Sequence, residues 1–168
     1  MSREGSRKLR VLMICMGNIC RSPTAEGVLR HKLREAGLDG LVEVDSAGTG
    51  NWHVGSPPDA RAQRHARSRG YDLSSLRARQ VKLRDFERFD FVLVMDDENL
   101  ADVLEICPPE HRTRVLPLMN HATRSASLIV PDPYAGGPED FEVVLDYIED
   151  ACDGLVAHIS QRLRKPAP

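Results

Sequence analysis

The chain has 168 residues, of which 41% are hydrophobic and 29% are charged, a composition that excludes a disordered protein. This length favours a single domain whose core needs no disulfide or metal to be stable. The net charge of −2 argues against a general nucleic-acid-binding protein, because such proteins have a strong basic excess.

Cysteine content and the N-terminal segment indicate the cellular class. Four cysteines are too few for a small secreted disulfide framework, and no Cys/His cluster has zinc-site spacing. The apolar run at residues 11–16 is too short for a signal peptide or a membrane span. We therefore expect a cytoplasmic protein with no metal, nucleic-acid or membrane partner, present as a monomer or weak dimer. Residues 1–8 are expected to be flexible, and residues 9–164 to form one domain.

Charge is distributed unevenly along the chain. Residues 61–84 carry seven Arg and one Lys against one Asp, a net charge of +7. Residues 85–168 carry 7 basic and 17 acidic side chains, a net charge of −10. The basic stretch is typical of a solvated helix face, and the alternative is a surface for an anionic partner.

The first elements follow from short apolar runs and their boundaries. Residues 9–14 predict a strand covered on both faces, because four apolar residues follow one another. Ser22 and Pro23 predict the N-cap and first position of a helix that ends near Gly37. Residues 41–46 predict a second strand.

The second half alternates in the same way. A Gly- and Pro-rich loop at 48–58 precedes a predicted helix at 59–69 that ends at Gly70. A strand is then predicted at 89–95, a helix from Asp96 or Asp97 to Ile106, and a strand at 114–118. A loop at 120–137 follows, and an amphipathic helix is predicted from Phe141 to Leu163. This alternation predicts an α/β fold, a parallel sheet with helices on both faces. Its ligand is expected beyond the carboxyl ends of the strands.

The segment between the first strand and first helix carries the chemistry, and reads Cys15-Met16-Gly17-Asn18-Ile19-Cys20-Arg21-Ser22. A loop there points backbone N–H groups into a concavity at a helix N-terminus, which suits phosphate. Gly17 permits a sharp bend, and Arg21 can grip two phosphoryl oxygens. Helix N-termini and nearby cations lower the pKa of a thiol from about 8.5 to roughly 3.5–7.5. We therefore expect Cys15 to be a thiolate at neutral pH.

This segment, followed in order by VDSAGTGNWHVG, VMDDEN and PDPY, closely resembles the low-molecular-weight protein tyrosine phosphatases. The resemblance extends from about Arg10 to the terminal helix. It implies a four-stranded parallel sheet flanked by helices, with the phosphate-binding loop between the first strand and the first helix. It also implies that Cys15 is the nucleophile, Arg21 the phosphate clamp and Asp132 the general acid.

The resemblance assigns supporting roles to further residues. It implies that Asn18 and Ser22 shape the loop and stabilise the thiolate, and that Ser46 bonds Asn18 from the end of the second strand. Asp96 and Asn99 also match the family, as structural contacts behind the loop.

The substrate side of the site follows from two loops. Pro131 and Pro133 hold Asp132 on a stiff extended segment, which suits a positioned general acid. Trp52 and Tyr134 would be aromatic walls of a slot above the thiolate. The neighbours of Trp52 are not those of a core residue, which favours the slot, and His53 is a further candidate for its rim. A deep aromatic slot suits phosphotyrosine.

Three positions depart from the family pattern. Ala135 stands where several relatives have a second aromatic residue, which reduces one side of the slot. Leu76 stands where many relatives have a His that bonds the serine of the loop, so this support is missing. Ile19 stands where relatives that act on phosphoarginine tend to have Thr, which favours a tyrosine phosphatase.

We therefore predict a tyrosine phosphatase that acts through a phosphocysteine intermediate, without a cofactor, on phosphotyrosine proteins, a tyrosine kinase being one candidate. The alternatives are a thioredoxin-coupled arsenate reductase and a phosphoarginine phosphatase. The reductase needs two further neighbouring cysteines, and Cys107 and Cys152 are 45 residues apart. A catalytically silent phosphate-binding module is the third class, and it would be expected to lack Cys15, Arg21 or Asp132.

Cys20 has two readings. Both thiols belong to one tight loop, so Cys15 and Cys20 could reach the Cα separation that a disulfide needs. A Cys15–Cys20 bridge would protect the oxidised nucleophile from irreversible over-oxidation, as relatives with this second cysteine are thought to do. The alternative is that Cys20 only fills space beneath the loop.

Overall fold

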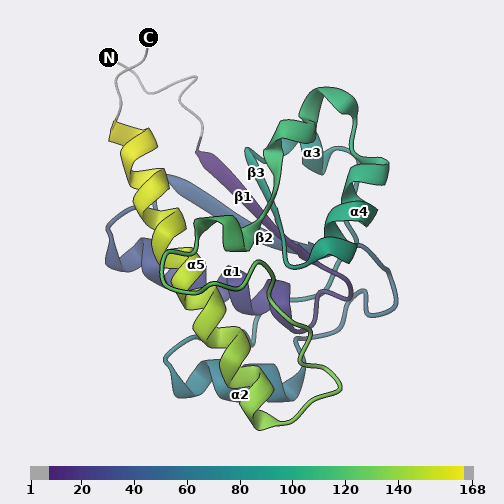
Figure 1. The fold of residues 1–168 in the computed structure, drawn as a ribbon, viewed down its shortest axis with the longest axis vertical. Helices are drawn as coiled ribbons and strands as arrows, with labels where there is room; N and C mark the ends of the chain where they lie inside the picture. The colour runs from purple at the N-terminus through teal and green to yellow at the C-terminus, as the bar shows by residue number, and fades with distance from the viewer. Residues whose placement is uncertain (1–7, 165–168) are drawn as a thin grey trace.

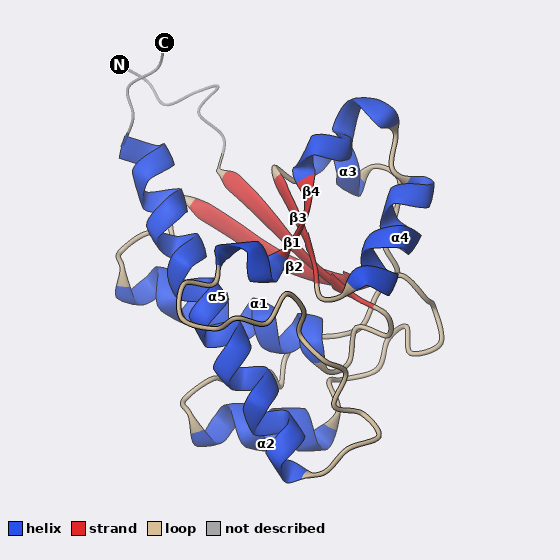
Figure 2. Cartoon of the chain, in the orientation of Figure 1, coloured by secondary structure: helices blue, strands red, loops and turns tan. Residues whose placement is uncertain are grey.

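The computed structural model describes residues 8–164, so residues 1–7 of the predicted flexible N-terminus lie outside the described residues. Its four strands are β1 (Leu9–Cys15), β2 (Val42–Gly48), β3 (Phe91–Val94) and β4 (Val115–Pro117). All neighbouring strands are parallel, in the order β2-β1-β3-β4 (Figure 2). The predicted four-stranded parallel sheet is confirmed.

Helices surround this sheet (Figure 1). They are α1 (Arg21–Glu35), α2 (Ala60–Ser68), α3 (Asp85–Arg88), α4 (Asp97–Ile106) and α5 (Pro138–Arg164), with 3₁₀ helices at Pro109–Arg114 and Leu118–His121. Val11 and Met13 of β1 pack in a core cluster with residues of α1 and α5. Leu12 and Ile14 point the other way and pack with residues of α3 and α4. Helices therefore cover both faces, which explains the uninterrupted apolar run of β1.

The start of α1 differs from its prediction. The helix begins at Arg21, with Cys20 rather than Ser22 at the N-cap and Pro23 at the third helical position. The predicted cap is wrong because the Ser22 hydroxyl lies 3.0 Å from the sulfur of Cys15 and makes no capping bond. A capping serine and a serine that faces a ligand loop have the same local sequence, so only the fold distinguishes them.

Short elements were also missed. The four-residue α3 and the 3₁₀ helix at Pro109–Arg114 are too short to give a helical periodicity. The predicted strand at 89–95 is only Phe91–Val94, a difference of the size expected at element ends. The helix predicted at 59–69 is present as α2, with Asp59 as a true N-cap that accepts from the backbone of Arg61 and Ala62.

The topology determines where the predicted phosphate-binding loop lies. Chain connections leave β1 for β2 on one side, and β3 lies on the other side, so the carboxyl end of β1 is the switch point of the sheet. Ligands of open α/β sheets bind at such a point. The loop from Cys15 to Arg21 lies there, between β1 and the N-terminus of α1.

Part of the basic stretch at 61–84 is neutralised within the fold. Arg69 forms ion pairs with three carboxylates of α5, those of Glu142, Asp146 and Glu149. Arg79 forms ion pairs with Asp45 and Asp85. This pairing favours the reading of the stretch as a structural and solvated face.

Candidate active site

Cys15 is the last residue of β1, and it is buried, with 3% of the residue exposed. Its sulfur accepts the backbone N–H of Asn18 at 3.3 Å and lies 3.0 Å from the hydroxyl oxygen of Ser22. Asn18 has φ 57°, a left-handed conformation that no other non-glycine residue adopts among the described residues. This turn is costly for most residues, and it directs the Asn18 N–H toward the sulfur.

The side chain of Asn18 locks the loop from within. Its Nδ2 donates to the hydroxyls of Ser22 and Ser46 at 2.7 and 3.0 Å. Its Oδ1 accepts the backbone N–H of Arg79 at 3.0 Å. The predicted contact between Ser46 and Asn18 is present. Every polar atom of this buried amide therefore has a partner, and one side chain ties together α1, β2 and the segment after α2.

The end of β2 packs directly on the loop backbone. The N–H groups of Thr49 and Gly50 donate to the carbonyls of Cys15 and Met16, each at 2.9 Å. A Cβ at Gly48 would lie 2.7 Å from the Met16 carbonyl oxygen, so only glycine allows this approach.

Arg21 is held from behind the pocket. Arg21 is 3% exposed. Its Nη1 donates to the Asp96 carboxylate at 2.6 Å and to the Val130 carbonyl at 2.9 Å. Asp96 also accepts the N–H of Asn99 and so caps α4. The Val130 N–H donates to the carbonyl of Met95, the residue directly after β3. These contacts fix the guanidinium and direct Nη2 toward Asp132, 3.9 Å away.

Asp132 lies at the mouth of the same pocket. Its side chain is 43% exposed, and Oδ1 accepts the backbone N–H of Tyr134 at 3.1 Å. A carboxyl in this position contacts both the buried guanidinium and solvent. It can therefore exchange a proton with water and with a group bound in the pocket.

A pocket of about 320 Å³ brings the predicted groups together. Its lining residues are Cys15, Met16, Gly17, Ile19, Cys20, Arg21, Trp52, His53, Asp132 and Tyr134. The volume lies in the range of small-ligand sites. Trp52 is 69% exposed and Tyr134 53% exposed, so both aromatic side chains stand at the rim instead of in the core.

Only a weak sequence signal pointed to two residues that lie at the rim of the pocket, His53 and Arg61. A Cβ on Gly17 would lie 3.1 Å from the His53 ring, which places His53 against the loop. Arg61 donates to the Tyr134 carbonyl at 2.9 Å, and its guanidinium lies 5.5 Å from the centre of the Tyr134 ring. The basic stretch at 61–84 was the only sequence signal for Arg61.

The positions that depart from the family pattern are also placed. Leu76 is partly buried against the main core and has no group that could bond the loop serine. Ala135 is exposed beside Tyr134. Ile19 lines the pocket and packs against a small cluster of Cys20, Ala62 and Phe141.

The cysteines are free thiols in buried surroundings. Burial first, and the nearby Asp59 carboxylate second, raise the pKa of Cys20 well above its ordinary value. Cys20 therefore stays protonated at neutral pH. Cys152 belongs to the core cluster on the α1/α5 face of the sheet, and Cys107 to the cluster on the α3/α4 face.

Within residues 8–164, no group of three or more His, Cys, Asp or Glu residues could hold a metal ion. No helix in the same part of the chain is long and apolar enough to cross a membrane.

Known proteins resemble this chain along most of its length. A low molecular weight protein-tyrosine-phosphatase of Streptomyces coelicolor is 41% identical over 157 residues, 92% of this chain and 95% of the relative. A crystal structure of an Entamoeba histolytica protein tyrosine phosphatase superposes with a TM-score of 0.90 at 35% identity and covers 93% of this chain and 99% of that one. A crystal structure of a Drosophila arginine phosphatase has a TM-score of 0.83 at 30% identity. The superposition covers 90% of this chain and 98% of that one.

The sequence model of one family matches residues 10–165, and that family is described as low molecular weight phosphotyrosine protein phosphatase. The match spans both the loop between β1 and α1 and the segment that contains Asp132. The chain therefore belongs to the low molecular weight protein tyrosine phosphatases.

Proposed function

We propose that this chain hydrolyses phosphotyrosine through a phosphocysteine formed on Cys15. The observation that carries the proposal is that the Cys15 thiol, the Arg21 guanidinium and the Asp132 carboxyl line one pocket. They come from the end of β1, the start of α1 and the loop after residue 130. Nucleophile, anion clamp and proton donor are the three functions that this reaction requires.

In the first step, the Cys15 thiolate attacks phosphorus in line with the leaving phenol oxygen. The S–P bond forms as the P–O bond to the tyrosine breaks, and the protonated Asp132 gives its proton to the departing oxygen. Arg21 and the loop N–H groups stabilise the charge on the equatorial oxygens. Since Arg21 Nη1 is bound to Asp96 and Val130, we assign this contact to the remainder of the guanidinium.

In the second step, water attacks phosphorus and Asp132, now a carboxylate, takes the proton from that water. The S–P bond breaks, and inorganic phosphate and the Cys15 thiolate are released. The Ser22 hydroxyl, 3.0 Å from the sulfur, supports the thiolate in both steps by donating a hydrogen bond to it.

The substrate that fits best is a phosphotyrosine side chain of a protein, a tyrosine kinase being one candidate. Trp52 and Tyr134 flank the pocket and give its mouth an aromatic rim. Cys15 lies buried below them, so a long, flat side chain reaches the sulfur more readily than phosphoserine does.

Phosphoarginine is the second candidate, because a Drosophila arginine phosphatase shares the fold. Ile19 on the pocket wall favours phosphotyrosine. An arsenate reductase relay is disfavoured, because Cys107 and Cys152 are buried in clusters on opposite faces of the sheet.

The experiment compares wild type with Cys15→Ser on phosphotyrosine, phosphoserine and phosphoarginine peptides and on p-nitrophenyl phosphate. We expect phosphotyrosine and p-nitrophenyl phosphate to be hydrolysed by the wild type only. A preference for phosphoarginine, or thioredoxin-dependent reduction of arsenate, would replace the proposal by the corresponding alternative.

A further inference from the structure

A second groove shares a wall with the pocket that contains Cys15. Its volume is about 420 Å³, and Met16 and Trp52 line both the groove and the pocket. Its other walls are the loop after β2, residues 80–81 and part of α4. The mechanism above does not use this groove. A phosphoprotein substrate, however, extends beyond its phosphotyrosine side chain, so the groove lies where flanking residues of the substrate can reach it.

The backbone beneath the shared wall holds that wall in place. A Cβ on Gly50 would overlap the Trp52 ring, so the indole lies directly on the Gly50 backbone. The Gly50 N–H in turn donates to the Met16 carbonyl at 2.9 Å. Trp52 is nevertheless 69% exposed and Met16 37% exposed. The wall therefore offers apolar surface to a ligand that crosses from the pocket into the groove.

The α4 wall of the groove is acidic. Glu98, Asp102 and Glu105 are exposed, and none of their carboxylates forms an ion pair or a hydrogen bond with another group of residues 8–164. The groove has no Lys, Arg or His in its lining. Ile106, which is 44% exposed, adds apolar surface beside these charges. The groove therefore combines apolar surface with unpaired negative charge.

The stability of α4 does not explain this arrangement. Glu98, Asp102 and Glu105 are spaced by four and three residues, so neighbouring like charges lie one helical turn apart and repel each other. Glu105 also lies in the last turn of α4, where a negative charge interacts unfavourably with the helix dipole. A cationic group in the groove would relieve both effects.

We propose that this groove binds the part of a phosphoprotein substrate that flanks the phosphotyrosine, and that it selects a lysine or arginine there. The long stem of such a side chain is apolar and packs on Trp52, Met16 and Ile106, while its charged head reaches the α4 carboxylates. A metal ion would leave the apolar surface uncovered. The inference rests on the proposed function, because it names the class of substrate for that site.

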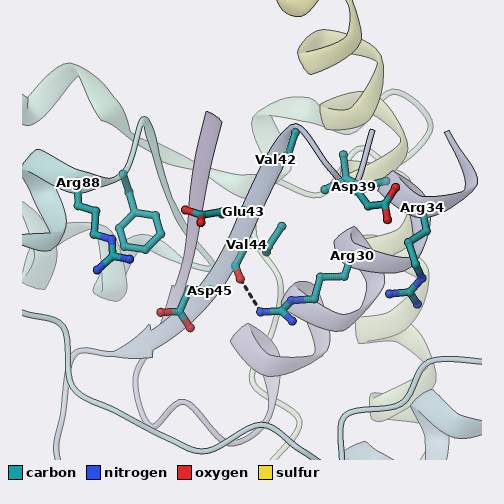
Figure 3. A pocket seen from close by; sticks show the side chains of 10 residues that line it. Arg30, Arg34, Asp39, Val42, Glu43, Val44, Asp45 and Arg88 are labelled. Atoms are coloured by element: carbon teal, nitrogen blue, oxygen red, sulfur yellow. Dashed lines mark hydrogen bonds between the residues drawn. The ribbon is translucent and has the colours of Figure 1, made fainter. Parts of the chain in front are cut away.

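Another groove of similar size lacks this combination. Figure 3 shows a groove of about 410 Å³ that is lined by residues of α1, β2 and the end of α3. It shares no lining residue with the pocket of Cys15. Its charged residues have both signs: Arg30, Arg34, Arg88, Asp39, Glu43 and Asp45. A cationic segment is therefore not favoured there, and Asp39 provides a carboxylate for a control variant.

The test compares phosphotyrosine peptides that differ at one position, which carries Lys, Ala or Glu and is moved over three residues on either side of the phosphotyrosine. The test variant combines Asp102→Asn with Glu105→Gln. The matched control combines Asp39→Asn with Glu110→Gln, which removes two exposed carboxylates outside the groove. The quantity measured is kcat/KM at low ionic strength, with p-nitrophenyl phosphate as a substrate that has no flanking residues.

We expect the wild type to prefer Lys over Ala by about fivefold at one or more positions, mainly through KM. The preference should shrink at high salt, because exposed charges are screened. The test variant should lose the preference, the control should keep it, and all three proteins should hydrolyse p-nitrophenyl phosphate at similar rates. Equal kcat/KM for all peptides in the wild type, or an equal loss of preference in the control, would overturn the proposal.

Charge reversal gives a result that a general loss of activity cannot produce. Glu105→Lys places a cation in the groove at a helix position that favours it. The variant should therefore prefer Glu over Lys in the peptide at the position that the scan identifies. An unreversed preference for Lys would mean that the α4 carboxylates do not contact the substrate.

The groove and the proposed function can fail separately. Cys15→Ser should bind phosphopeptides without turnover, so the ratio of Kd for the Lys and Ala peptides measures the preference by fluorescence anisotropy. A wild type that hydrolyses no phosphotyrosine would refute the proposed function, and the Kd ratio would still decide about the groove, since a ratio of about one overturns it. Normal hydrolysis without any preference would refute the groove alone.

Discussion

The two sides of the pocket are built differently. On the side of the proposed nucleophile, Cys15, Asn18, Arg21 and Ser22 are each at most 3% exposed. Asn18 bonds to Ser22 and to Ser46 of β2, Ser22 contacts Cys15, and Arg21 bonds to Asp96 and Val130. On the opposite side, Asp132 and Tyr134 lie on an exposed loop. A rigid, buried cradle suits charge stabilisation, and an open rim suits substrate entry and proton exchange with water. Substitutions on the first side should therefore impair hydrolysis of every substrate. Substitutions on the second side should impair hydrolysis to a degree that depends on the leaving group, or reduce the stability of the loop.

The largest effect is expected for Cys15→Ser. A serine hydroxyl stays protonated at neutral pH, so turnover should be abolished, while the cradle and Arg21 should still bind phosphate or vanadate. Steady-state hydrolysis and vanadate titration measure the two properties. Activity within about tenfold of wild type would refute Cys15 as the nucleophile.

Arg21→Lys tests the clamp on the same side. An ammonium cannot make a bidentate contact with the phosphoryl group or reproduce the contacts to Asp96 and Val130. We expect kcat to fall by roughly 10²–10³ with a small change in KM. A change confined to KM would mean that Arg21 binds the ground state only.

Asp132→Asn tests the proposed general acid on the exposed side of the pocket. We expect one limb of the pH–rate profile to disappear and kcat on phosphotyrosine to fall by roughly 10²–10⁴. The loss should be smaller for p-nitrophenyl phosphate, whose leaving group departs without a proton. Equal losses on both substrates would mean that Asp132 is structural.

Cys20→Ser asks whether the nucleophile side has a protective thiol. After peroxide treatment and then reductant, wild type should recover most of its activity through a Cys15–Cys20 disulfide seen by mass spectrometry, and the variant should recover little. The raised pKa of Cys20 keeps that thiol protonated and therefore slow to react with peroxide itself. Equal recovery of both proteins would show that Cys20 only packs beneath the loop.

The smallest effect concerns the anchor of the loop that carries Asp132. Asp150 of α5 is buried and accepts the backbone N–H groups of Thr123, Arg124 and Ser125 at 3.0, 3.2 and 2.6 Å. Burial pushes the pKa of Asp150 upward, but these N–H groups outweigh it and hold the pKa below its ordinary value. We expect Asp150→Asn to cost about 2 kcal/mol of unfolding free energy at neutral pH.

The pH dependence of that cost follows from the lowered pKa. The stabilisation is fully present above the unfolded-state pKa of about 3.9 and is lost as the pH falls through the folded-state pKa. The difference in unfolding free energy between the two proteins should therefore begin to shrink below about pH 4 and disappear only below the lowered folded-state pKa of Asp150. A difference that persists unchanged into strong acid would mean that the ionised carboxylate is not the anchor.

The sequence alone predicted the Cys15 side of the pocket better than the Asp132 side, and the reason is physical. Cys15, Asn18, Arg21 and Ser22 are contiguous, and one apolar strand before a helix is enough to place them together. The parallel sheet could also be expected, because strands alternate with helices along the chain, whereas the strand order came only from the structure. Asp132 and Tyr134 were found through the family motif, since spacing alone does not bring residue 132 to residue 15.

The remaining contacts depend on tertiary packing. Arg61 reaches Tyr134 and Val130 offers its carbonyl to Arg21 across more than 70 positions of the sequence. The Ser22 cap was mispredicted because a local rule assigned to the helix a hydroxyl that the fold directs to the thiol.

The central claim is that a covalent phosphocysteine forms on the buried side of the pocket. Asp132→Asn is mixed with p-nitrophenyl phosphate and quenched in denaturant, because this variant lacks the base for the second step while the activated leaving group still departs. Mass spectrometry of the digest should find the phosphoryl group on the peptide that contains Cys15. A burst of p-nitrophenol with no phosphoryl group on that peptide, or with the group on another residue, would contradict the account.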